Sequence, residues 1–139
     1  MRGTSRSEPG LAEIAAAGIE PALADPARPG TVLDLVGDVA AVVWLLGSAQ
    51  GRVEELEAVH GSSLERVLER LVETPLRSFV YEAGGNVDER LLETGVRLVA
   101  EAGDRWRIPV LMPKKVALSD IAKLGYELGK KVFRPQASK

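Results

Sequence analysis

Tyr81 and Glu82 end a short apolar run and stand just before the glycine pair Gly84–Gly85. If that run is a strand of an α/β fold, this is the end at which such folds bind ligands. A carboxylate there can act as a general acid or base when it is buried. The stretch offers it no nucleophile or metal-binding partner, so we expect Tyr81 and Glu82 to line a pocket. The alternatives are a turn cap or an ion pair with a nearby arginine.

Few other residues could carry chemistry. The chain has no cysteine, which excludes disulfides, cysteine-bound zinc and thiol catalysis. His60 is the only histidine, so a multi-histidine metal site is excluded and we expect a surface or capping position. Trp44 and Trp106 lie in or just before apolar runs and are expected to be packing residues. Lys114 and Lys115 could contact a phosphate, but two lysines after a strand are usually solvated.

Length and composition fit one globular domain over 1–139, with loose ends at 1–6 and 133–139. The net charge of −2 gives no sign of a nucleic acid or an anionic membrane as partner. The longest strongly apolar run, Val39 to Leu46, is too short to span a bilayer. The first residues lack the apolar stretch of a signal peptide. These features predict a cytoplasmic protein.

Four short apolar runs with β-branched residues predict buried strands at 19–24, 39–46, 78–81 and 108–112. Helical patterns lie before, between and after them. In the first, Ser7 is the expected N-cap and Gly18 stands where a C′ glycine ends a helix. The other predicted helices are a short one over 31–36, one with an apolar stripe from Leu64 to Val72 and a capping box of Ser62 and Glu65, one opened by Asp88, and a last one from Leu118 to Leu128.

This alternation predicts an α/β fold with a parallel, Rossmann-like, three-layer sheet of about four strands and flanking helices. A doubly wound sheet begins with a strand, whereas the patterns here begin with a helix. We therefore expect a fold that is N-terminally incomplete. Loss of a central strand leaves unpaired backbone groups on its neighbours. Closure of those neighbours, a partner at the edge, or a truncated reading of a longer protein would each account for them.

The segment "RGTSRSEPGLAEIAAAGIEPALAD" resembles the second βα unit and third strand of NAD(P)-binding Rossmann proteins. The most similar type is the atypical or extended short-chain dehydrogenase group, with its NmrA-like and epimerase-like members. The segments "VAAVVWLLGSAQG", "TPLRSFVYEAGG" and "RWRIPVLMPKK" resemble the fourth, fifth and sixth strands. The resemblance implies the strand order 3-2-1-4-5-6, with strand one absent here and strand two reduced to a stub.

The resemblance also implies a cofactor, NADP, and the residues that would contact it. They are Arg2, Thr4 and Arg6 at the 2′-phosphate, Asp25 near the adenine, Gly47 and Ser48 at the tip of the fourth strand, and Tyr81 and Glu82 at the tip of the fifth. Each position has a plainer alternative. The arginines would be solvated terminal charges, Asp25 a turn cap before Pro26, and Gly47 a strand-to-loop turn.

Two motifs of the family are missing. No G-x-x-G-x-x-G loop opens the chain to hold a pyrophosphate. The catalytic Y-x-x-x-K is absent at strand five, where Tyr81 is followed four residues on by Gly85. Tyr126 and Lys130 have the spacing, but on a terminal helix. We therefore expect an NAD(P)-binding protein that is not catalytically competent.

Three alternatives stay open for the function. One is an N-terminally truncated NAD(P)-dependent oxidoreductase or epimerase. Another is a non-catalytic regulatory or interaction module that forms a homodimer through helices at 62–73 and 88–102. The third is an enzyme of another kind that uses Glu82 in a pocket beside Ser48.

Overall fold

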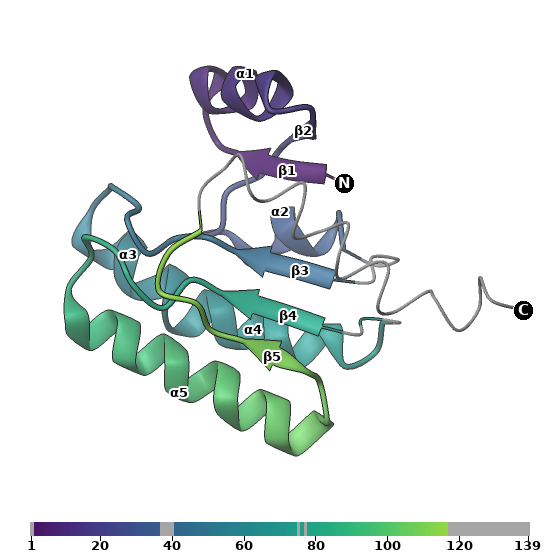
Figure 1. Cartoon of the computed structure of the whole chain (residues 1–139), viewed down its shortest axis with the longest axis vertical. Helices are drawn as coiled ribbons and strands as arrows, with labels where there is room; N and C mark the ends of the chain where they lie inside the picture. The colour runs from purple at the N-terminus through teal and green to yellow at the C-terminus, as the bar shows by residue number, and fades with distance from the viewer. Residues whose placement is uncertain (1, 37–40, 75, 77, 117–139) are drawn as a thin grey trace, which may run out of the picture. The chain divides into compact units, whose positions relative to one another are not determined.

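The structure is a computed structural model that describes residues 2–36, 41–74, 76 and 78–116. These residues form two compact units, a smaller one up to Asp25 that also includes Val116, and a larger one over Pro26–Lys115. Each unit is an arrangement of parallel strands and helices (Figure 1). The predicted α/β class with a parallel sheet and flanking helices is therefore confirmed. The predicted last helix, including Tyr126 and Lys130, lies outside the described residues.

The smaller unit is one βαβ element. Strands β1 (Arg2–Ser5) and β2 (Glu20–Leu23) pair in parallel and are joined by helix α1 (Glu8–Ala16). Ser7 caps the helix as predicted, because its side chain accepts a hydrogen bond from the Gly10 amide at 3.2 Å. Gly18 follows the C-cap residue with a φ of 80°, a conformation that glycine adopts without steric cost.

The prediction that the fold begins on a helix is wrong, because β1 precedes α1. Its sequence, RGTS, has one β-branched residue and no apolar run, so propensity gives no strand signal. The strand is specified by its pairing with β2 and by close packing instead. A Cβ atom on Gly3 would lie 2.8 Å from a methyl of Ile14 and 3.2 Å from one of Ile19. Both isoleucines are buried and form the core of this unit.

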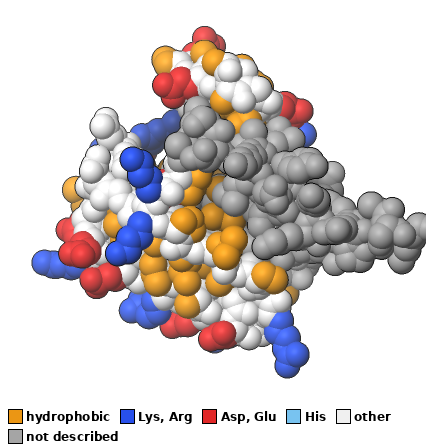
Figure 2. Space-filling model, in the orientation of Figure 1, with side chains coloured by type: hydrophobic (Ala, Val, Ile, Leu, Met, Phe, Trp, Pro, Cys, Tyr) orange, Lys and Arg blue, Asp and Glu red, His pale blue; other side chains and the backbone are white. Residues whose placement is uncertain are grey.

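The larger unit contains a three-stranded parallel sheet in the order β3-β4-β5, with its strands pointing the same way (Figure 1). The strands are β3 (Ala41–Trp44), β4 (Ser78–Tyr81) and β5 (Val110–Leu111), and the helices are α2 (Pro29–Leu33), α3 (Val53–Val59), α4 (Ser62–Leu71) and α5 (Glu89–Trp106). All four residues of the central strand β4 are buried. Figure 2 shows hydrophobic side chains gathered over this sheet, where Leu111 of β5 is 49% exposed.

The helices confirm most of the apolar pattern and correct two details. Leu64, Val67, Leu68 and Leu71 of α4 are buried as predicted, but Val72 follows the helix and is 42% exposed. The capping box of Ser62 and Glu65 is also wrong. Gly61 is the N-cap and there is no side-chain cap hydrogen bond. Ser62 and Ser63 are the first two residues of the helix itself. Helix α3 has no counterpart among the predicted helices, because its seven residues include three glutamates and only a short apolar series of Val53, Leu56 and Val59.

The predicted single sheet of about four strands is a two-stranded and a three-stranded sheet among the described residues. Within each sheet the pairing follows the chain without inversion. β1 lies beside β2, β3 beside β4, and β4 beside β5, always through a helical crossover. The carboxyl ends of the strands in each sheet therefore lie on the same side, where the loops that could hold a ligand begin.

Candidate functional site

The loops that follow β3, β4 and β5 are joined to one another at the carboxyl end of the larger sheet. The Gly47 amide donates to the Glu82 carboxylate at 3.0 Å, and the Val87 amide donates to the Gly47 carbonyl at 3.0 Å. The Asn86 amide donates to the Ser48 hydroxyl at 3.1 Å. The structure thus brings together four of the predicted site residues, which are Gly47, Ser48, Tyr81 and Glu82.

The glycines of these loops are required by the protein's own backbone. A Cβ atom on Gly47 would overlap the Gly84 carbonyl, and one on Gly85 would overlap the Gly47 carbonyl. Gly85 also has a φ of 141°, which side-chain-bearing residues rarely adopt. The close approach that Gly47 was expected to offer a cofactor is therefore occupied by the neighbouring loop. Ser48 is exposed, whereas Glu82 is half-buried and holds the Gly47 amide.

Tyr81 is fully buried and its hydroxyl lies 2.6 Å from Nδ1 of His60. The other ring nitrogen of His60, Nε2, lies 2.8 Å from the Leu46 carbonyl oxygen. A carbonyl only accepts hydrogen bonds, so Nε2 carries the ring proton and donates it to Leu46. In the neutral imidazole, which the lowered pKa of His60 favours, Nδ1 is then the acceptor for the Tyr81 hydroxyl.

Burial sets the titration of both side chains. Desolvation lowers the pKa of His60, although its bond to Leu46 and the charge of Glu82 act in the opposite direction. Desolvation raises the pKa of Tyr81, and the nearby Glu82 charge raises it further. His60 is the C-cap residue of α3, so the predicted capping position is found. The predicted surface position is wrong, because none of the side chain is exposed.

The hydrogen bond between His60 and Tyr81 connects the end of α3 to β4 inside the core, where neither side chain can contact a ligand. Proton transfer to a substrate requires contact with it, and neither side chain reaches the surface. Sequence reasoning missed this pair because the two residues are 21 positions apart, and neither belongs to a periodic pattern. Trp44 acts in the same way, since its indole nitrogen donates to the Val59 carbonyl at 3.0 Å.

The remaining predicted site residues belong to the smaller unit. Arg6 directly follows β1 and Asp25 lies two positions beyond β2. Both residues therefore lie just past the carboxyl ends of the two parallel strands. The two strands stay joined there, because the Ala24 amide donates to the Ser5 carbonyl at 3.1 Å. Thr4 is exposed within β1.

Arg2 lies at the amino end of β1, whereas Arg6 follows its carboxyl end. The Arg2 guanidinium pairs with Glu20 at 2.8 Å, and this contact lowers the pKa of the Glu20 carboxyl. At about 3.3 Å per strand residue, the Cα atoms of Arg2 and Arg6 are more than about 10 Å apart. Arg2 is thus engaged by Glu20, and a joint phosphate site of the two arginines stays a prediction.

The start of α1 concentrates donors beside Arg6. The Ser5 hydroxyl accepts from the Ser7 amide at 3.3 Å, and the Ser7 hydroxyl lies 3.5 Å from that of Ser5. A Cβ atom on Gly10 would overlap Ser5, so the serines lie close against the first turn of the helix. The Ser7 and Gly10 amides are bonded to these hydroxyls, Pro9 has no amide hydrogen, and Glu8 in the first turn is acidic. Arg6 and the two hydroxyls are therefore the groups at this helix start that could donate to an anion.

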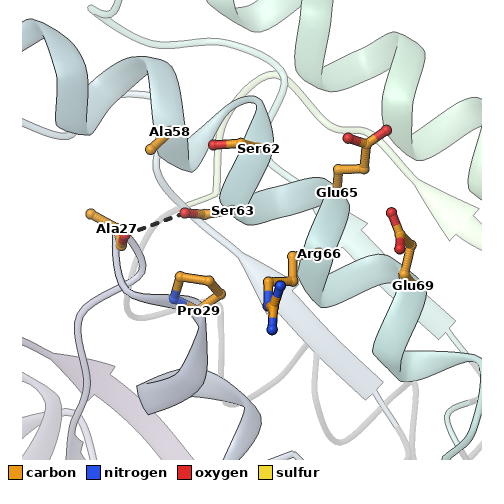
Figure 3. A pocket seen from close by; sticks show the side chains of 8 residues that line it. All are labelled: Ala27, Pro29, Ala58, Ser62, Ser63, Glu65, Arg66 and Glu69. Atoms are coloured by element: carbon orange, nitrogen blue, oxygen red, sulfur yellow. Dashed lines mark hydrogen bonds between the residues drawn. The ribbon is translucent and has the colours of Figure 1, made fainter.

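A separate hollow of about 430 Å³ lies between the segment before α2 and the start of α4 (Figure 3). The Ser63 hydroxyl points across it and donates to the Ala27 carbonyl at 3.4 Å. Glu65 and Glu69 project from another side of the helix. The charged residues that line it, Glu65, Arg66 and Glu69, all belong to α4.

Among the described residues, no three histidine, cysteine or acidic side chains are grouped so that they could hold a metal ion. The same part of the chain has no helix both long and apolar enough to cross a membrane. Lys114 and Lys115 are exposed as predicted, and the Lys114 carbonyl abuts Gly84.

The elements described above define an α/β protein with parallel strands. Comparisons of the chain with protein-family models, with curated proteins and with solved structures found no match.

Proposed function

We propose that this chain is a Rossmann-like protein that binds the adenosine 2′-phosphate end of NADP and does not itself transfer hydride. The strand pairing supports the Rossmann-like assignment. If β1 and β2 correspond to strands two and three, their pairing matches the 3-2 side of the order 3-2-1-4-5-6. The order β3-β4-β5 then matches the 4-5-6 side.

The observation that carries the proposal is the position of Arg6. It follows β1 at the carboxyl edge of a parallel pair and directly precedes the N-cap of α1. Rossmann proteins that prefer NADP place an arginine near the ribose, where its donors match a phosphate. The Ser5 and Ser7 hydroxyls would add hydrogen-bond donors. Asp25 lies past the carboxyl end of the neighbouring strand β2 and would accept a hydrogen bond from the adenine amino group.

The same structure gives a reason to propose binding without redox chemistry. Tyr81 is the tyrosine that the resemblance places at strand five, and its hydroxyl is buried against His60. Its raised pKa also disfavours the ionised form that a proton-transfer role would use. Gly47 and Glu82 contact each other rather than an open pocket.

The proposal is tested by calorimetry with NADP, NAD and the two adenosine monophosphates. Adenosine 2′-monophosphate should compete with NADP, because it retains the phosphate that Arg6 would bind. Adenosine 5′-monophosphate and NAD should bind at least about tenfold more weakly, the equivalent of one charge-assisted hydrogen bond. Equal affinity for NAD and NADP, or no binding of either, would refute the proposal.

The second candidate function is that of an interaction module using helices α4 and α5. It is favoured by a groove of about 480 Å³ between them that contains the exposed side chain of Val72. A homodimer through these two helices, which the sequence predicts, is one form of such a module. Sedimentation equilibrium would then report twice the 14.9 kDa chain mass, and the monomer mass at high concentration would exclude it.

A further inference from the structure

The groove between α4 and α5 combines an apolar floor with an acidic rim. Its apolar side chains are Leu68 and Val72 from the first helix and its end, and Leu98, Ala102 and Trp106 from the second. Val72 is 42% exposed, which is unusual for a valine within an otherwise buried stripe. The charged lining residues are Glu65, Glu69, Glu73, Glu101 and Arg105.

The rim has a single dominant sign of charge. Four glutamates against one arginine leave a formal charge of −3 on the lining. Glu65, Glu69 and Glu73 follow one another at four-residue intervals, a spacing at which like charges repel on a helix. Within the described part of the chain no ion pair engages these glutamates, and Arg105 lies 5.8 Å from the Trp106 ring rather than against a carboxylate.

We propose that this groove binds a basic amphipathic helix of another protein. Charge decides between this occupant and a second copy of the chain. A two-fold dimer would place the same surface on both sides of the contact, so each −3 groove would face another. A helix with lysines or arginines beside an apolar stripe would instead neutralise the rim and cover Val72.

The length of the groove matches such a ligand. The lining residues extend from Glu65 to Glu73 along one side and from Leu98 to Trp106 along the other. At 1.5 Å per helical residue each side is about 12 Å long, or about two turns. Two turns accommodate apolar anchors at positions i, i+3 or i+4, and i+7. The cationic residues of the ligand would lie on either side of this stripe, opposite the glutamates.

The test uses a fluorescent synthetic peptide of leucine and lysine, about 18 residues or five helical turns long, with leucines at helical spacing. Fluorescence anisotropy of the full chain with this peptide should show saturable binding that weakens between about 0.05 and 0.5 M NaCl. A scrambled peptide of the same composition should bind at least about tenfold more weakly, because it has no continuous apolar face.

Two sets of variants locate the site. The double substitution Glu69→Lys with Glu73→Lys changes the formal charge of the lining from −3 to +1, since each reversal adds two charges. It should weaken peptide binding at least about tenfold. Glu54→Lys with Glu57→Lys, at two exposed sites on α3 outside the groove, makes the same change in charge and should alter peptide binding less than about twofold. Val72→Ser should weaken binding about threefold at both salt concentrations, because its contribution is apolar.

Three results would overturn the proposal. The first is no peptide binding at low salt. The second is an equal loss in the Glu54→Lys/Glu57→Lys and Glu69→Lys/Glu73→Lys variants, which would mean attraction by overall charge. The third is a dimer of the unmodified chain that Val72→Ser converts to a monomer, which would assign the groove to a second copy. None of these results depends on NADP, so they test the groove separately from nucleotide binding.

Discussion

The Tyr81 hydroxyl lies 2.6 Å from Nδ1 of His60, and both side chains are fully buried in the larger unit. The second nitrogen of His60 is held by the Leu46 carbonyl. The two side chains thus connect the end of α3, the loop after β3 and the strand β4 through polar contacts inside an apolar core. In a low-dielectric setting such a pair is stabilising only while both partners are satisfied.

Removal of the Tyr81 hydroxyl should therefore be costly. Tyr81→Phe leaves Nδ1 of His60 buried without its donor, which should lower the free energy of unfolding by about 1–3 kcal/mol. Urea denaturation measures this difference. Adding His60→Leu to Tyr81→Phe should cost less than the two single losses combined, because the unsatisfied nitrogen is then removed too. Strict additivity of the two losses would contradict the coupling.

Stability should depend on pH through His60. Because burial lowers its pKa in the folded state, the unfolded chain binds the proton first as the pH falls. Stability is fully present above the unfolded pKa of about 6.5 and is lost below it, by up to about 1.4 kcal/mol per pH unit. Denaturation midpoints between about pH 5 and 8 measure this slope. His60→Gln should flatten it, and an unchanged slope in that variant would assign the effect to other groups.

Gly95 should be irreplaceable for a similar reason. A Cβ atom on this α5 residue would overlap the Tyr81 hydroxyl and ring. Gly95→Ala should therefore destabilise the protein by about 1–3 kcal/mol, despite the higher helix propensity of alanine. Gly30→Ala in α2 is the matched control, because nothing lies within 4 Å of its added Cβ. Thermal unfolding should show a loss for the first variant and no loss for the second; equal behaviour would contradict the packing described.

Glu82 should act as a structural acceptor rather than an acid or base. Glu82→Gln keeps an oxygen for the Gly47 amide and should change stability by less than about 1 kcal/mol, whereas Glu82→Ala removes it and should cost about 1.5–3 kcal/mol. Chemical denaturation of both variants compares them. If glutamine were as damaging as alanine, the carboxylate charge rather than the hydrogen bond would be the stabilising feature.

The sequence predicted those parts of the fold that depend on local signals. Ser7 before α1, Gly18 after it and Asp88 before α5 are found where capping chemistry placed them. Apolar runs located β2, β3, β4 and β5; β4 has the predicted bounds, and the ends of the other three lie one or two residues inside the predicted runs. The apolar pattern missed strand β1, which the resemblance implied only as a stub of strand two, because its pairing with β2 specifies it. Helix α3 was missed because its seven residues are short and rich in glutamate.

The candidate site was less predictable than the fold. Gly47, Ser48, Tyr81 and Glu82 do meet at the ends of neighbouring strands, as parallel topology requires. No local pattern could show that Tyr81 turns toward His60, or that the Gly84–Gly85 backbone occupies the space beside Gly47. Those contacts depend on how loops that are distant in sequence pack together. The separation of Arg2 from Arg6 likewise follows from a strand that the pattern did not indicate.

The comparison of Arg6→Ala with Arg2→Ala in NADP calorimetry tests the central claim most directly. The two arginines flank the same strand, but only Arg6 lies at its carboxyl edge. We predict that Arg6→Ala weakens NADP binding at least about tenfold and removes the preference over NAD, whereas Arg2→Ala changes the affinity less than about twofold. An equal effect of the two substitutions, or an unchanged preference in Arg6→Ala, would contradict a 2′-phosphate site at the start of α1.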